Sequence, residues 1–220
     1  MRKIIVSMFL SMDGVIQAPG GPEEDRAGGF EWGGWIFHYE DEGTNRAMSE
    51  LLSQPFDLLL GRRTYEIFAA HWPYQDDEIG RKFNRIKKYV VATTPVDTSW
   101  ENSILINCNV VQELKKLKET AGPDLLVHGS SVLVQALLAN ELVDVLHTLT
   151  YPITIGAGKR LFDDGTQPRQ WKVTQSSISP TGVFIARYEP DGNLNQGSFI
   201  PDKPSEAELR RRERWADENS

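Results

Sequence analysis

Short apolar runs that alternate with segments of helical periodicity constrain the fold of this chain more than any other feature. The runs are rich in Val, Ile and Leu, and they lie at residues 3–10, 56–61, 87–95, 103–107 and 124–129. Strands that are buried on both faces of a parallel sheet read as continuous apolar runs, and helices connect them. The alternation therefore predicts an α/β fold with a mostly parallel central sheet and helices on both faces.

The pattern changes after residue 142. Three strand-like segments follow without helical segments between them, at residues 143–153, 171–179 and 182–190. We expect them to form an antiparallel addition at one side of the sheet. The chain then becomes polar, so we predict one domain over residues 1–190 and a peripheral or disordered tail over residues 191–220.

Charge and cysteine content exclude several classes of function. The formal net charge of -7 offers no basic excess for a nucleic-acid backbone, so no nucleic-acid partner is expected. Cys108 is the single cysteine, which excludes an intramolecular disulfide and a multi-cysteine zinc site, and we expect no metal. No apolar run approaches the roughly 20 residues that a membrane helix needs. We therefore expect a cytoplasmic protein with no membrane partner.

Three joints, where a predicted strand ends and small or basic residues follow, are candidates for ligand binding. They are Gly61 to Thr64, Thr93 with Thr94, and Gly129 to Ser131. In an open parallel sheet, ligands bind beyond the carboxyl ends of the strands, where helix starts present free amides to anions. Ordinary helix capping is the better explanation of any single joint, but three joints on consecutive units favour a phosphate-bearing ligand. The Gly-x-Gly-x-x-Gly fingerprint and the Walker-type loop are absent.

Five motifs in a fixed order resemble a known family. "SMDGVI", "GRRTYE", "VVATTP", "HGSSVLVQALL" and "PITIGAGKRLF" are similar to the dihydrofolate reductase superfamily. Within it they most resemble the C-terminal reductase domain of the bacterial bifunctional riboflavin-biosynthesis deaminase/reductase. The resemblance covers residues 3 to 188. It implies a dihydrofolate-reductase-like fold, an NADPH cofactor, hydride transfer to a small heterocyclic or sugar-linked molecule, and a possible homodimer.

The resemblance also implies roles for individual residues. Arg62, Arg63 and Thr64, with Gly61 before them, would hold the cofactor phosphates, and Thr93 and Thr94 would lie near the adenosine 2′-phosphate. The pyrophosphate would be lined by Gly129, Ser130, Ser131 and Val132. The nicotinamide would lie near the turn that contains Met12, Asp13, Gly14, Val15 and Ile16, and the aromatic-rich loop from Pro19 to Trp35 would close over it.

The substrate side is less defined. Folate reductases carry an acidic residue where this chain has Gly43, Thr44 or Asn45, with Asp41 just upstream, so folate is a doubtful substrate. Asp13 is the candidate catalytic carboxylate, although an Asp before Gly also suits an ordinary turn. Arg26, Lys159 and Arg160 are candidates to bind a substrate phosphate, and they equally suit a solvated surface.

Three functions stay open at this level. The leading one is an NADPH-dependent reductase similar to the 5-amino-6-(5-phosphoribosylamino)uracil reductase of riboflavin biosynthesis. The second is a nucleotide-binding protein that keeps the fold without catalysis. The third is a reductase of broad specificity. Oxidation of NADPH by an added acceptor distinguishes the enzymes from the binding protein.

Overall fold

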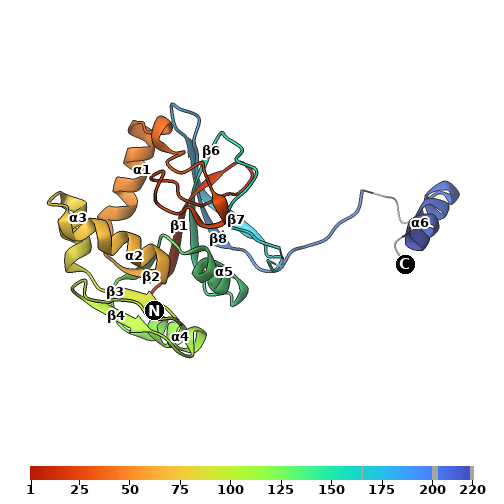
Figure 1. The fold of residues 1–220 in the computed structure, drawn as a ribbon. Coiled ribbons are helices and arrows are strands. Elements are labelled where there is room, and N and C mark those ends of the chain that lie inside the picture. The colour runs from red at the N-terminus through yellow and green to blue at the C-terminus, as the bar shows by residue number, and fades with distance from the viewer. Residues whose placement is uncertain (165, 200–202, 219–220) are drawn as a thin grey trace.

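The computed structural model describes residues 1–164, 166–199 and 203–218. An eight-stranded sheet forms its centre, with the strand order β4-β3-β2-β5-β1-β6-β8-β7 (Figure 1). The strands are β1 (Ile4–Ser11), β2 (Phe56–Gly61), β3 (Lys88–Val91), β4 (Ser103–Ile106), β5 (Asp124–Val127), β6 (Val145–Tyr151), β7 (Trp171–Ile178) and β8 (Phe184–Pro190). The α-helices are α1 (Glu42–Ser53), α2 (Arg62–His71), α3 (Glu78–Arg85), α4 (Val110–Glu119), α5 (Ser131–Ala139) and α6 (Glu206–Glu218).

The six strands from β4 to β6 are parallel, which confirms the expected fold class. The expectation that residues 143–153 belong to the antiparallel part is wrong. β6 pairs in parallel with β1, since α5 acts as the crossover that brings the chain back to the same end of the sheet. Only β8 runs antiparallel to β6, and β7 then pairs antiparallel with β8.

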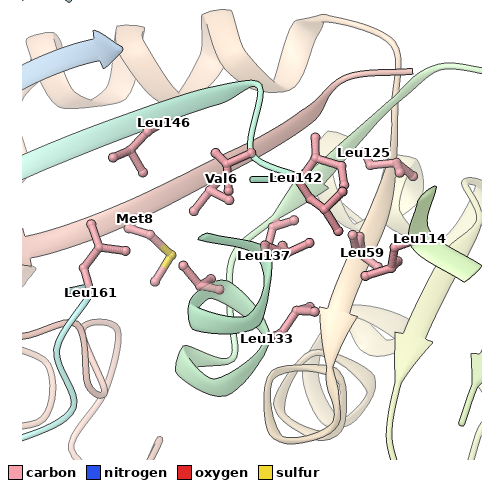
Figure 2. Close-up of a cluster of buried hydrophobic side chains, with 14 of the residues drawn as sticks. Val6, Met8, Leu59, Leu114, Leu125, Leu133, Leu137, Leu142, Leu146 and Leu161 are labelled. Atoms are coloured by element: carbon pink, nitrogen blue, oxygen red, sulfur yellow. The ribbon is translucent and has the colours of Figure 1, made fainter. Parts of the chain in front are cut away.

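The two faces of the sheet bury separate hydrophobic clusters. Alternation along β2 directs Leu59 toward α4 and α5, whereas Leu58 and Leu60 face α1, α2 and α3. Figure 2 shows the first cluster, in which Leu133 and Leu137 of α5 pack over the sheet. Each fully buried Leu contributes roughly 1.5–3 kcal/mol to folding, so this packing fixes the helices on the sheet.

The C-terminal helix α6 differs from the other helices. It has no buried residue, and in Figure 1 it lies away from the sheet. Within the part of the chain that the structure describes, no helix is long and apolar enough to cross a membrane.

Candidate functional site

A cavity of about 1200 Å³ lies at the carboxyl ends of the central parallel strands. Its wall includes residues at or just after the ends of β2, β3 and β5, and the segment that follows β1. This is the edge where open parallel sheets bind ligands, because the connections to the helices diverge there. The cavity is therefore the candidate site.

The starts of α2 and α5 form one wall of the cavity. Gly61 precedes α2 and Ser130 precedes α5, and neither provides a side-chain hydrogen bond to the first turn of its helix. The first amides of a helix have no acceptor within the helix, and the helix dipole makes this end positive. The two starts therefore present N–H groups and positive potential to a ligand.

Two glycines allow these helix starts to lie against each other. The Gly61 amide donates to the carbonyl of Gly129 at 3.0 Å. A Cβ on Gly61 would lie 2.3 Å from Ser130 Oγ, and a Cβ on Gly129 would lie 2.7 Å from Thr64 Oγ1. Gly129 also has a φ of 131°, which disfavours other residues. Side chains at these two positions would separate the amides that the close approach brings together.

Three cations line the cavity, and each has an acidic partner. Arg62 pairs with Glu66 at 2.8 Å, and Arg63 lies 3.5 Å from Asp25. Lys159 also pairs with Asp25. Partial burial opposes ionisation of Asp25, but the hydrogen bonds from Lys159 and the Ala27 amide, together with the charges of Lys159 and Arg63, outweigh it and lower the pKa of this carboxyl. Asp25 thus connects the loop after β1 to the start of α2.

Most of the residues predicted to bind a cofactor line this one cavity, although the sequence places them in four separate segments. Met12 and Gly14 do not line it, and the Met12 side chain is largely exposed. Their proposed contact with a nicotinamide is not supported by their position. The predicted residues that do line it are Ile16, Gly61, Arg62, Arg63, Thr64, Thr93, Thr94, Gly129, Ser130, Ser131 and Val132.

Asp13, the predicted catalytic carboxylate, holds a turn together and does not line the cavity. It accepts hydrogen bonds from the Ser11 hydroxyl at 2.6 Å and from the amides of Ile155 and Gly156 at 3.1 and 2.7 Å. Desolvation opposes its ionisation, but these hydrogen bonds outweigh that effect and lower its pKa to about 2. An ionised carboxylate with three donors is a poor proton donor, so the position favours the turn-forming interpretation and not the catalytic one.

Asp41 is also a structural carboxylate. It caps α1 by accepting from the Thr44 amide at 2.8 Å, and it accepts from the amide and hydroxyl of Thr181. Desolvation opposes ionisation of Asp41, yet these hydrogen bonds hold its pKa below the ordinary value. Neither Asp41 nor Thr44 lines the cavity, so neither takes the place of the acidic residue that folate reductases carry in this region.

The loop after β1 divides into two parts. Residues 16–25 line the cavity, whereas Phe30 is buried against Val15 and Ala18. Trp35 packs edge-to-face on Tyr151 and donates its indole N–H to the carbonyl of Gln17 at 2.8 Å. These two aromatic residues therefore anchor the loop, and the part nearer to β1 borders the cavity.

Glu24 is a cavity residue that the sequence analysis missed. Its Oε2 accepts hydrogen bonds from the amides of Gly20 and Gly21 at 2.6 and 3.2 Å. Burial raises its pKa despite these bonds, so Glu24 retains a proton more readily than an ordinary carboxyl. Nothing in the sequence distinguishes it from Glu23, because its burial comes from the fold of the loop.

A second part of the cavity lining is apolar, and we call it the apolar lobe. It is formed by side chains of α1, α2 and α3 and by Trp72, which directly follows α2. Phe68 stacks on Phe83 with ring centroids 5.8 Å apart and lies 6.1 Å from the ring of His128. The lobe comprises Met48, Leu52, Ile67, Phe68, Trp72, Ile79 and Phe83.

The remaining predicted residues are divided between the cavity and the surface. Lys159 lines the cavity, whereas Arg26 pairs with Glu23 at the surface and does not line it. Arg160 does not line it either, and it donates to the carbonyls of Asp13 and Gly156. No cluster of His, Cys, Asp or Glu suited to a metal ion occurs among the described residues.

Comparison with known proteins places this geometry in context. A family model described as the RibD C-terminal domain matches residues 2–185 of this chain. The protein YyaP of Bacillus subtilis (strain 168), which is described as uncharacterized, is 26% identical over 196 residues. The match covers 87% of this chain and 96% of YyaP.

Solved structures share the fold at low sequence identity. A Thermotoga maritima diaminohydroxyphosphoribosylaminopyrimidine deaminase/5-amino-6-(5-phosphoribosylamino)uracil reductase matches with a TM-score of 0.57 and 15% identity, over 86% of this chain and 57% of that enzyme. Dihydrofolate reductase from Enterococcus faecalis, complexed with NADP(H) and RAB-propyl, matches with a TM-score of 0.52 and 16% identity, over 88% and 97% of the two chains. These matches confirm the dihydrofolate-reductase-like fold.

Proposed function

This chain belongs to the RibD C-terminal domain family, as its motifs predicted, and from that premise we propose that it is a reductase that uses NADPH. The family and the fold are reductase-like. The finer assignment depends on one observation in this chain: two uncapped helix starts, α2 and α5, lie against each other at the cavity.

The residues at these starts fit a dinucleotide. The amides at the beginning of α2 and α5 would hold the pyrophosphate, and Arg62 and Arg63 add planar cationic groups that suit phosphate. Thr93 and Thr94 are exposed after β3 and would contact the adenosine ribose and its 2′-phosphate. The bound cofactor would supply the hydride, so the protein's part is to bind, orient and exclude water.

Glu24 is the residue we assign to proton transfer. Its Oε2 is engaged by two backbone amides, so the proton would reside on Oε1. A carboxyl whose pKa is raised by burial is better suited to deliver a proton than the fully ionised Asp13. Glu24→Gln should lower kcat by tenfold or more and leave NADPH affinity unchanged.

A titration with NADPH and NADH tests the cofactor assignment. Trp72 lines the cavity, so energy transfer from tryptophan to the reduced nicotinamide reports binding. Arg63→Ala should weaken NADPH binding by roughly tenfold or more, because it removes a charge-assisted hydrogen bond to phosphate.

Arg81 offers a matched control for Arg63. Both arginine side chains are about half exposed, and each pairs with an aspartate. Arg81 lies 3.0 Å from Asp76 and does not line the cavity. Arg81→Ala should leave NADPH affinity unchanged. Failure of both nucleotides to bind at millimolar concentration, or equal effects of the two substitutions, contradicts the assignment. NADPH binding without oxidation by any acceptor indicates the non-catalytic alternative.

A further inference from the structure

We propose that the apolar lobe selects an uncharged aromatic or heteroaromatic acceptor that carries no phosphate group. This inference rests on the proposed function, which assigns the starts of α2 and α5 to the cofactor. The acceptor then has the apolar lobe, which is formed by side chains of α1, α2 and α3 and by Trp72.

The chemistry of the lobe suits a flat ring. Its side chains are aliphatic and aromatic, and four aromatic rings lie in contact behind the surface. Trp72 meets Phe83 edge-to-face at 4.8 Å, Phe83 stacks on Phe68 at 5.8 Å, and Phe68 lies 6.1 Å from His128. Aromatic rings favour offset-stacked and edge-to-face neighbours at these distances, so such a wall recognises another ring.

The charges of the cavity disfavour a phosphate on the acceptor. The cavity contains three Lys and Arg residues, none of them in the lobe, and Arg63 and Lys159 share Asp25 as their partner. The proposed function commits Arg62 and Arg63 to the cofactor, so a phosphate on the acceptor would have to displace Asp25 from Lys159 or remain beside Glu23 and Glu24, which also line the cavity. Placing an anion without a free cation is costly, so a phosphorylated acceptor binds less favourably.

His128 does not supply the missing charge. Burial, with a smaller contribution from His147 when that residue is protonated, lowers the pKa of His128 to about 4. It is therefore neutral at physiological pH. The ring acts as part of the aromatic wall, next to Phe68.

Riboflavin and FMN provide a matched pair of probes, because they share one ring system and differ only by a phosphate. Binding of each to the protein saturated with NADP⁺ is measured by flavin fluorescence anisotropy at pH 8, where an ordinary histidine is neutral. Riboflavin should bind at least tenfold more tightly than FMN. Equal or tighter binding of FMN overturns the proposal, and so does failure of both flavins to bind.

A substitution that adds the missing cation sharpens the test. Ile67 lines the lobe and is absent from the buried clusters, so Ile67→Lys should fold normally. It should shift the affinity ratio toward FMN by at least fivefold, whereas Ile178→Lys, at an exposed site on β7 outside the cavity, should not. An unchanged ratio in Ile67→Lys overturns the proposal.

NADPH titration of the same preparations tells whether the acceptor inference or the proposed function has failed. If NADPH binds and the flavin preference is absent, only the acceptor inference fails. If NADPH does not bind, the proposed function fails, whatever the flavins do.

Discussion

Two groups of helix starts in this protein are built differently. At α1 and α3 the chain supplies its own cap: Asp41 accepts from the Thr44 amide, and Asp77 accepts from the Gly80 amide at 2.7 Å. At α2, α4 and α5 the residues Gly61, Asn109 and Ser130 provide no side-chain hydrogen bond to the helix. All three of these uncapped helices place residues of their first turn on the cavity.

The uncapped starts of α2 and α5 are the ones to which the proposed function assigns a bound anion. A side-chain cap typically stabilises a helix by about 1 kcal/mol, so the uncapped starts forgo a stabilisation that α1 and α3 have. Ser130 is of a residue type that caps well, but its side chain does not do so here. An aspartate at these starts would satisfy the amides and occupy the space that an anion needs.

The largest effect should come from separating the two uncapped starts. In Gly61→Ala the new methyl group would lie 2.8 Å from the Ser130 amide nitrogen as well as near its hydroxyl, so α5 must shift. We expect NADPH affinity to fall by well over tenfold and the unfolding free energy to fall by roughly 2–3 kcal/mol. Energy transfer and urea denaturation measure the two effects.

Gly197 provides the control for this substitution. A Cβ at Gly197 meets nothing within 4 Å, so Gly197→Ala should change the unfolding free energy by less than about 0.5 kcal/mol. Equal affinity of Gly61→Ala and the unaltered protein for NADPH would show that the juxtaposition of the starts is irrelevant to binding.

Removing a cap should affect stability and not binding. Asp41→Ala loses the hydrogen bonds to Thr44 and Thr181, so we expect the melting temperature to fall by roughly 4–8 °C. NADPH affinity should change by less than twofold, because Asp41 does not line the cavity. A large loss of NADPH affinity in this variant would contradict the distinction between capped and uncapped helix starts.

Placing a charge at an uncapped helix start should affect NADPH binding and not stability. Ser131→Asp places a carboxylate in the first turn of α5, where it favours the helix by about 0.3–1 kcal/mol and repels phosphate. We expect NADPH affinity to fall about tenfold with no loss of melting temperature. Ser131→Asn, which has the same shape without the charge, is the control and should retain most of the affinity.

The smallest effect concerns acid stability. Because the folded-state pKa of Asp41 lies below its ordinary value, its contribution to stability is complete above about pH 4 and is lost as the pH falls further. Asp41→Asn should lack this pH-dependent contribution. Its melting temperature should therefore fall less steeply between pH 5 and pH 3 than that of the unaltered protein. Asp76→Asn, at a fully exposed side chain, should follow the slope of the unaltered protein.

Several details of these helix starts were predictable, and others were not. The positions of the three joints follow from the sequence, because a buried strand, a small residue and a helical pattern succeed one another there. At α1 the chain offers both Asp41 and Thr44 as capping residue types, and the structure has Asp41 as the cap and Thr44 as the third residue of the helix. Asn109 is of a residue type that caps well, but it adopts a left-handed conformation with a φ of 46° and its side chain does not cap α4.

The role of a side chain depended most on contacts that are remote in sequence. The sequence suggested Asp13 as the catalytic carboxylate because of its place in the turn after the first strand. Its hydrogen-bond partners Ile155 and Gly156 lie more than 140 residues away in the chain. Glu24 and the apolar lobe gave no signal at all. Their properties arise from burial and from the meeting of three helices, which local patterns do not encode.

The sequence by itself determined the α/β class, the resemblance to a reductase family and the residues of the strand-to-helix joints. These follow from local periodicity, turn chemistry and the order of motifs along the chain. The tertiary structure alone decided that β5 lies between β1 and β2, which brings the joints at Gly61 and Gly129 into contact. Strand order is set by the packing of the whole sheet, so only the folded chain shows that two separate turns form one wall of one cavity.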